Sequence, residues 1–273
     1  MHTKNRDMPD KKNPVRLILI SAFIVLTSFV LFKPKEKPTL FLIGDSTVKN
    51  GKGKGDGAQW GWGSVIGEYF DTTKIKVENR ALGGTSSRTY RSKGLWDAVL
   101  KDLKPGDFVI MQFGHNDGSP LDDTARARGT IKGTGDETKE IYNPITKQQE
   151  VVHTYGWYLT QFIRETKAKG AIPIVCSPVP RNNWENGTLK RGSGGYEKWA
   201  EETAVSAGAY FINLNKLVSD QYDAIGETKV RSFFPADHTH TNYEGAKINA
   251  ASVAGGIRSV KGLKLSSYLN TKN

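Results

Sequence analysis

Cysteine is almost absent from this chain of 273 residues, in which Cys176 is the single example. One cysteine cannot form a disulfide within the chain, and metal sites built on clustered cysteines are excluded as well. Cys176 ends the short apolar run Ile172–Cys176, and this position predicts a small, buried hydrophobic side chain.

Several familiar motifs are missing too. The sequence has no G-x-S-x-G, which argues against an ordinary α/β-hydrolase. The glycine- and lysine-rich stretch 51–55 lacks the G-x-x-x-x-G-K-[ST] pattern, so we interpret it as the flexible rim of a site and not as a phosphate-binding loop. RNP, zinc-finger and basic-region patterns are also absent, which makes nucleic acid the weakest candidate partner.

Long hydrophobic runs are limited to one, Val15–Phe32, which spans 18 residues and follows a basic stretch. This order is typical of a secretory signal, and the length is near the minimum for a membrane-spanning helix. No A-x-A cleavage site follows, and the run ends in the linker Lys33–Pro38. We therefore expect residues 1–38 to be a signal peptide or signal anchor with a linker. The protein would then be secreted, periplasmic or membrane-anchored, and would touch a membrane only through this run.

Acidic residues are too few to balance the basic ones, with 28 Asp and Glu against 39 Lys and Arg and a net charge of +11. A surplus of positive charge favours anionic partners, such as an acidic polysaccharide or a membrane surface, although it can also serve solubility alone.

The remaining residues, 39–273, predict one α/β domain with a central parallel sheet and helices on both faces. Apolar runs predict strands, and helical spacing predicts helices, at alternating positions along the chain. The expected strands are 39–43, 75–79, 108–113, 172–176 and 210–214, and the expected helices are 63–70, 95–100, 155–169, 196–207 and 242–260. We interpret the polar, glycine-rich segment Gly118–Val152 as a long functional or mobile loop.

Polar segments follow the predicted strands and precede the last predicted helix. Ligands of open α/β sheets bind beyond the carboxyl ends of the strands, so we expect these segments to meet at one edge. They are Gly44–Thr47, Asn79–Ser86, Gly114–Asp117 and Asp237–His240.

This set of residue types suits acyl transfer. Ser46 needs a base to become a nucleophile, His240 can be that base, and Asp237 can orient its ring. A backbone N–H at the glycine pair 83–84 and an asparagine side chain can stabilise an oxyanion. Each feature also has an ordinary interpretation: Gly-Asp-Ser as a turn, Asp237 as a turn cap, Asn116 as a turn residue. His238 competes with His240 as the base, and His115 and His153 can be surface or core residues.

The four segments resemble the four blocks of the SGNH hydrolases, also called the GDSL family. Here they read GDST, NRALGGTSSRTY, FGHND and DHTHT, and the resemblance runs from about Thr39 to Val260. It implies a three-layer, flavodoxin-like fold. Within the family the chain is most similar to the rhamnogalacturonan acetylesterases, on the segments Gly61–Gly63 and Phe234–Thr241.

The resemblance also implies roles for single residues. Ser46 is the expected nucleophile, His240 the base and Asp237 its partner. The backbone N–H groups of Ser46 and Gly84 and the side chain of Asn116 would form the oxyanion hole. Gly84 fits the alignment better than Gly83. Neither a metal nor another cofactor is expected.

The leading hypothesis is a carbohydrate esterase that removes O-acetyl groups from a plant cell-wall polysaccharide, in the first place rhamnogalacturonan. Basic and aromatic residues near the motifs are the expected substrate-binding residues, because arginine suits a carboxylate and tryptophan a sugar ring. They are Trp62, Arg88, Arg91 and Trp184, with Trp60, Arg181, Lys190 and Arg191 as further candidates. Alternatives are an esterase for acetylated xylan, peptidoglycan or a lipid ester, and a glycan-binding protein with a vestigial site.

Overall fold

The computed structural model describes residues 1–2, 36–51, 55–192 and 194–270. Residues Lys37–Asn273 form one compact unit, separate from Met1–Glu36. The predicted signal run Val15–Phe32 lies outside the described residues. Among the helices that are described, none is long and apolar enough to cross a membrane.

A five-stranded parallel sheet forms the centre of the Lys37–Asn273 unit, in the order β2-β1-β3-β6-β9. This is the flavodoxin-like order, so the predicted α/β fold class is confirmed. Leu42 shows the register at the middle of the sheet, because it pairs with Asn79 on one side and Ile110 on the other. The strands are β1 (Thr39–Gly44), β2 (Lys76–Asn79), β3 (Phe108–Gln112), β6 (Ile172–Cys176) and β9 (Tyr210–Ile212).

The inner strands β1, β3 and β6 are buried on both faces, because they are continuous apolar runs whose side chains alternate between two cores. Leu40 and Leu42 point into one core, and Phe41 and Ile43 point into the other. Cys176 is fully buried in the first core, as predicted.

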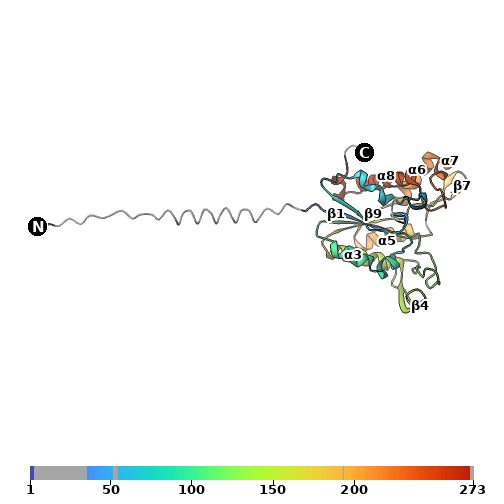
Figure 1. The fold of residues 1–273 in the computed structure, drawn as a ribbon, viewed down its shortest axis with the longest axis horizontal. Helices are drawn as coiled ribbons and strands as arrows, with labels where there is room; N and C mark the ends of the chain where they lie inside the picture. The colour runs from blue at the N-terminus through green and yellow to red at the C-terminus, as the bar shows by residue number, and fades with distance from the viewer. Residues whose placement is uncertain (3–35, 52–54, 193, 271–273) are drawn as a thin grey trace. The chain divides into compact units, whose positions relative to one another are not determined.

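Helices cover each face, which gives three layers (Figure 1). One layer contains η2 (Trp62–Ser64), η3 (Ile66–Tyr69), α6 (Leu214–Ile225), α7 (Glu227–Arg231), α8 (Tyr243–Ser259) and η4 (Lys264–Tyr268). The other contains α2 (Ser87–Ser92), α3 (Leu95–Asp102), α4 (Tyr155–Ala168) and α5 (Tyr196–Ala207). Asn242 is the N-cap of α8, and its side chain accepts from the N–H of Gly245.

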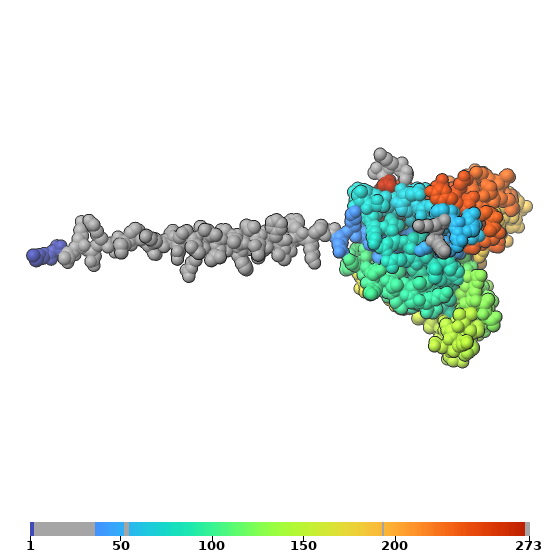
Figure 2. Space-filling view, viewed as in Figure 1, coloured from blue at the N-terminus to red at the C-terminus, as the bar shows by residue number. Residues whose placement is uncertain are grey.

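The segment Gly118–Val152 is not the long loop that we expected. It contains an antiparallel hairpin of β4 (Thr138–Asn143) and β5 (Gln148–His153), which projects from the body of the unit in Figure 2. The alternation of β4 is hard to recognise because only Ile141 and Asn143 are buried in it. Other differences are local: the expected helix at 63–70 is two 3-10 turns, and α2, α6 and α7 were not predicted.

Candidate active site

A cavity of about 800 Å³ lies at the carboxyl edge of the sheet. From β1 the chain continues to β2 on one side of it, and then crosses to β3 on the other side. The strand order therefore reverses between β1 and β3, and open α/β sheets bind ligands at such a point. The predicted segments after β1, β2 and β3 and before α8 all contribute to the lining. The cavity is lined by residues that include Ser46, Gly83, Gly84, Asn116 and His240.

Ser46, His240 and Asp237 form a continuous hydrogen-bonded chain. The hydroxyl of Ser46 lies 2.7 Å from Nε2 of His240, and Nδ1 of His240 lies 2.7 Å from Oδ2 of Asp237. The other oxygen of Asp237 accepts from the backbone N–H groups of Thr239 and His240, at 2.6 and 2.8 Å. Burial alone would raise the pKa of Asp237, but these hydrogen bonds outweigh it and hold the pKa below its usual value. An ionised Asp237 keeps hydrogen on Nδ1 and leaves Nε2 free to accept the serine proton.

The loop that carries Asp237 and His240 is fixed by backbone bonds to distant segments. The N–H of Trp60 donates to the carbonyl of Thr241 at 2.6 Å, and the N–H of Asn182 donates to the carbonyl of His238 at 2.7 Å. The ring of His238 is exposed, and its Nε2 lies 3.3 Å from Arg181. The geometry therefore favours His240 over His238 as the base.

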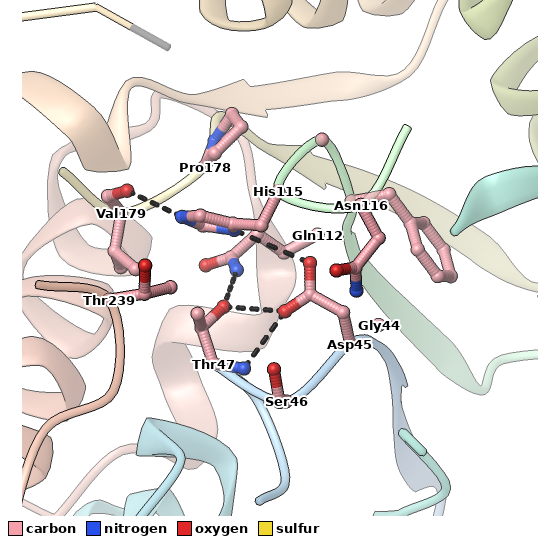
Figure 3. Close-up of polar contacts among 12 residues, drawn as sticks. Gly44, Asp45, Ser46, Thr47, Gln112, His115, Asn116, Pro178, Val179 and Thr239 are labelled. Carbon is pink, nitrogen blue, oxygen red and sulfur yellow. Dashed lines mark hydrogen bonds and ion pairs between the residues drawn. The ribbon is translucent and has the colours of Figure 1, made fainter. Parts of the chain in front are cut away.

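The turn that presents Ser46 depends on a close approach at Gly44. A Cβ there would lie 2.5 Å from the carbonyl oxygen of Gln112 and 2.6 Å from a methyl of Val48, so only glycine fits. The next residue, Asp45, is fully buried, and its Oδ1 accepts from both the N–H and the hydroxyl of Thr47, each at 2.8 Å. These bonds hold the backbone on both sides of Ser46 (Figure 3).

Around Asp45 a buried polar network continues, and Figure 3 shows it beside Ser46. Nδ1 of His115 lies 3.3 Å from the second Asp45 oxygen, and Nε2 of His115 donates to the carbonyl of Val179 at 2.9 Å. Gln112 donates to the hydroxyl of Thr47 at 2.6 Å. Burial alone would raise the pKa of Asp45, but His115 and Thr47 hold it below its usual value. His115 is thus a buried member of this network, while His153 stacks on Trp157 at 3.7 Å.

The two predicted oxyanion donors outside the serine line the same cavity. Gly84 has a φ of +80°, which favours glycine. Asn116 is 7% exposed, and its amide donates one hydrogen to the carbonyl of Thr85 at 2.7 Å, which leaves the second N–H free of that bond.

Asp117 ties the two donor loops together. It is fully buried and accepts from the N–H and hydroxyl of Ser87, at the start of α2, and from the N–H of Gly114, after β3. Burial raises the pKa of Asp117 to about 7, although the bonds from Ser87 oppose this and the charge of Asp45 adds to it. One side chain thus sets the spacing between the Gly84 and Asn116 loops.

Two predicted substrate-binding residues are corrected by their burial. Trp62 is fully buried, and its indole N–H donates to Gln112 at 2.9 Å, so its ring is part of the core beneath the site. Arg88 is 1% exposed, and its guanidinium is bonded to Glu150 and to the carbonyls of Leu121 and Gly129. Neither side chain can reach a substrate.

The other predicted substrate contacts also lie outside the cavity lining, apart from Arg181. Arg91 pairs with Glu165 of α4, and Arg191 pairs with Asp220 and Asp223 of α6. Trp184 donates to Asn182 at 2.7 Å and packs against the core.

Four cationic side chains line the cavity instead, and no carboxylate is among the described residues that line it. They are Lys93, Arg126, Arg128 and Arg181. Two of them, Arg126 and Arg128, lie in the short arginine-rich stretch Ala125–Arg128, inside the predicted loop Gly118–Val152. Ile145, in the turn of the β4–β5 hairpin, also reaches the cavity, and nothing local in the sequence indicates this.

A metal site is not apparent: in the described part of the chain, no three His, Cys, Asp or Glu side chains are grouped closely enough to hold an ion.

Comparison with known proteins agrees with this geometry. Residues 42–248 match the GDSL-like Lipase/Acylhydrolase family. The chain is 35% identical to the rhamnogalacturonan acetylesterase of Emericella nidulans over 83% of this chain and 87% of that protein. It is 32% identical to the probable rhamnogalacturonan acetylesterase YesY of Bacillus subtilis, over 80% of this chain and 92% of that protein. A crystal structure of the B. subtilis protein YxiM has a TM-score of 0.66 and 27% identity, and the match covers 82% of this chain and 57% of that one.

Proposed function

Because the chain belongs to the GDSL-like lipase/acylhydrolase family and is an ester hydrolase, we propose that it removes acetyl groups from a polysaccharide, with acetylated rhamnogalacturonan as the substrate. The observation that carries the esterase reaction is the chain of two 2.7 Å contacts through Ser46, His240 and Asp237. Two relatives above 30% identity that act, or are thought to act, on rhamnogalacturonan support the choice of polymer.

In the first half of the reaction, Ser46 Oγ attacks the carbonyl carbon of the acetyl ester while Nε2 of His240 accepts the hydroxyl proton. The negative charge that forms on the carbonyl oxygen is stabilised by the N–H groups of Ser46 and Gly84 and by the amide of Asn116. His240 then gives its proton to the departing sugar oxygen. The products of this half are a free sugar hydroxyl and an acetyl ester on Ser46.

In the second half a water molecule attacks the acetyl-Ser46 ester. His240 accepts a proton from the water and returns it to Ser46 Oγ, and acetate leaves. Asp237 stays ionised throughout and stabilises the imidazolium that forms in each half.

The cationic walls of the cavity support an anionic polymer as substrate. Rhamnogalacturonan carries a carboxylate on each galacturonate, and the cavity has four cationic side chains and no carboxylate among its described lining residues. Arginine can hold a carboxylate through two parallel hydrogen bonds. A neutral polymer such as acetylated xylan has no group that would use these cations.

We also propose that the enzyme works outside the cytoplasm, by way of the run Val15–Phe32. A polymeric substrate does not cross a membrane, so an exported site is the one that meets it. Fractionation of cells that express the full chain tests this, and activity confined to the cytoplasm would contradict it.

Acetate release from two polymers tests the substrate assignment. We expect a higher kcat/KM on acetylated rhamnogalacturonan than on acetylated xylan, and the ratio should shrink at high salt because exposed charges are screened over about 10 Å at 0.1 M. Equal or better activity on xylan, independent of salt, would contradict the anionic substrate and leave the esterase reaction standing.

A further inference from the structure

Two large apolar side chains line the catalytic cavity without belonging to a hydrophobic core. Leu82 is 37% exposed and Ile145 is 50% exposed, and neither is among the described residues that pack in the two cores. Apart from Ala125, the other described lining residues are glycines or carry polar or charged side chains. Single exposed apolar side chains are common on protein surfaces, but two on the lining of one polar cavity are typical of a ligand site.

Leu82 lies in the loop that follows β2, directly before the glycine pair 83–84. Its N–H donates to the carbonyl of Gly44 at 3.1 Å, and its carbonyl accepts from the hydroxyl of Thr85 at 2.8 Å. A Cβ added at the next residue, Gly83, would lie 3.6 Å from Cβ of Ser46. The backbone of Leu82 is therefore fixed one residue away from the part of the loop that faces the nucleophile.

Ile145 lies in the turn at the tip of the β4–β5 hairpin, where glycine, proline and small polar residues are usual. Its N–H donates to Oδ1 of Asn143 at 2.9 Å, and the amide of Asn143 donates to Oε2 of Glu150 at 2.6 Å. Glu150 is in turn paired with Arg88 of α2. A chain of polar contacts thus runs from the helix after the Gly84 loop to the turn, and it fixes the backbone of the isoleucine whose side chain lines the cavity.

The cavity therefore offers two kinds of contact, cationic side chains and exposed apolar ones. In the backbone of rhamnogalacturonan, galacturonate alternates with rhamnose, a sugar whose C6 is a methyl group. Galacturonate supplies a carboxylate for the cations, and rhamnose supplies an apolar group that a chain of galacturonate alone does not have. Removal of this methyl group from water against an apolar side chain is favourable for the same reason as burial in a core.

We propose that Leu82 and Ile145 form a subsite for the C6 methyl group of a rhamnose in the bound polymer. This inference rests on the proposed function for the identity of the sugar. The subsite distinguishes the alternating polymer from one made of galacturonate alone, which the cations cannot do because both polymers are anionic. It also gives the projecting hairpin a role in substrate choice.

Binding of the unacetylated rhamnosyl-galacturonate disaccharide to the full-length chain, measured by calorimetry, tests the subsite without any catalytic step. The comparison ligand is the same disaccharide with L-mannose in place of L-rhamnose, which differs only in a hydroxyl group at C6. We expect the rhamnose disaccharide to bind about three- to fivefold more tightly, which is the effect of one buried methyl group. The two ligands carry the same charge, so the cations contribute equally to both.

Three variants assign the preference to the two side chains. Ile145→Thr keeps the branched Cβ but replaces apolar surface by a hydroxyl, and it should bring the two affinities close to equal. Its Tm should stay near that of wild type because the side chain is half exposed. Leu82→Ala should also reduce the preference, since its backbone hydrogen bonds remain. Val151→Thr is the matched control: Val151 is 46% exposed on the same hairpin but does not line the cavity, so the preference should persist.

Equal binding of the two disaccharides by wild type would overturn the subsite, and so would an Ile145→Thr variant that keeps the full preference. If the preference is found while the enzyme releases no acetate from rhamnogalacturonan, the subsite stands and the proposed function fails. If acetate is released without any preference for the methyl group, the proposed function stands and the subsite fails.

Discussion

Arg88 and Glu150 form a bidentate ion pair, with Nε to Oε1 at 2.7 Å and Nη2 to Oε2 at 2.6 Å. The pair joins α2, which follows the Gly84 loop, to β5 of the projecting hairpin. Ile145, in the turn of that hairpin, lines the catalytic cavity. By holding the hairpin through Glu150, Arg88 therefore positions one wall of the cavity without lining it.

Removal of this arginine should destabilise the protein. Arg88→Met leaves two backbone carbonyls without their donor and leaves Glu150 only the hydrogen bond from the amide of Asn143, and breaking a buried pair costs about 3–5 kcal/mol. For a domain of this size the Tm should fall by roughly 6–20 °C. Arg231→Met is the matched control, because its pair with Glu227 is largely exposed and should contribute less than about 1 kcal/mol. Equal Tm values for the two variants would show that the Arg88 pair does not anchor the hairpin.

Asp237→Asn should show how much the orientation of the His240 ring contributes to catalysis, apart from any effect on folding. The amide can place the wrong tautomer of His240 against Ser46, and kcat should fall by about 10⁴. The pKa of Asp237 is below its unfolded value, so the carboxylate stabilises the fold above about pH 4, and this contribution is lost as the pH falls through the folded pKa.

The stability difference between wild type and Asp237→Asn should therefore be constant above about pH 5 and shrink in more acidic solution. Thermal unfolding of both proteins across this range measures it. A difference that grows as the pH falls would contradict the direction of the shift.

Asn116→Ala should lower kcat by roughly 10²–10³ with little change in KM, because the amide meets the oxyanion only in the transition state. The variant also frees the carbonyl of Thr85, so a Tm measurement must accompany the kinetics. If the loss appears mostly in KM, Asn116 binds the ground state of the substrate and is not an oxyanion donor.

The cationic side chains that line the cavity should lower KM for the anionic polymer, and this contribution should depend on the salt concentration. Arg126→Gln and Arg128→Gln should each raise KM for acetylated rhamnogalacturonan more than for p-nitrophenyl acetate, and the effect should weaken at high salt. Lys101→Gln removes the same charge from the end of α3, close to the start of β3 and so at the opposite edge of the sheet. A uniform loss with all three variants would indicate net charge rather than local binding.

The sequence predicts the central sheet and the position of the site because both depend on short-range patterns. The apolar runs of β1, β3 and β6 are buried on both faces, and the rule that sites follow parallel strands brings Ser46 and Asn116 together. His240 and Asp237 are three residues apart, which allows both to face one way on a turn.

The direction in which a side chain points could not be predicted from these patterns, because it depends on partners that are distant in the sequence. Arg88 is four residues after Gly84, but α2 begins at Ser87 and turns the arginine toward Glu150, 62 residues away. Trp62 lies in the Gly61–Gly63 segment between β1 and β2, and its indole is buried against Gln112 of β3. Two of the four cations that line the cavity, Arg126 and Arg128, reach it from a segment without recognisable periodicity.

In the proposed reaction Ser46 carries the acetyl group during the hydrolysis of acetylated rhamnogalacturonan. Acetate release from this polymer by wild type and by Ser46→Ala, at equal Tm, tests it most directly. We expect wild type to release acetate and Ser46→Ala to be slower by several orders of magnitude, as when the nucleophile of a triad is removed. A folded Ser46→Ala variant that keeps more than about a tenth of the wild-type rate would contradict the account, because such a change in barrier, less than about 1.4 kcal/mol, is too small for the loss of the nucleophile.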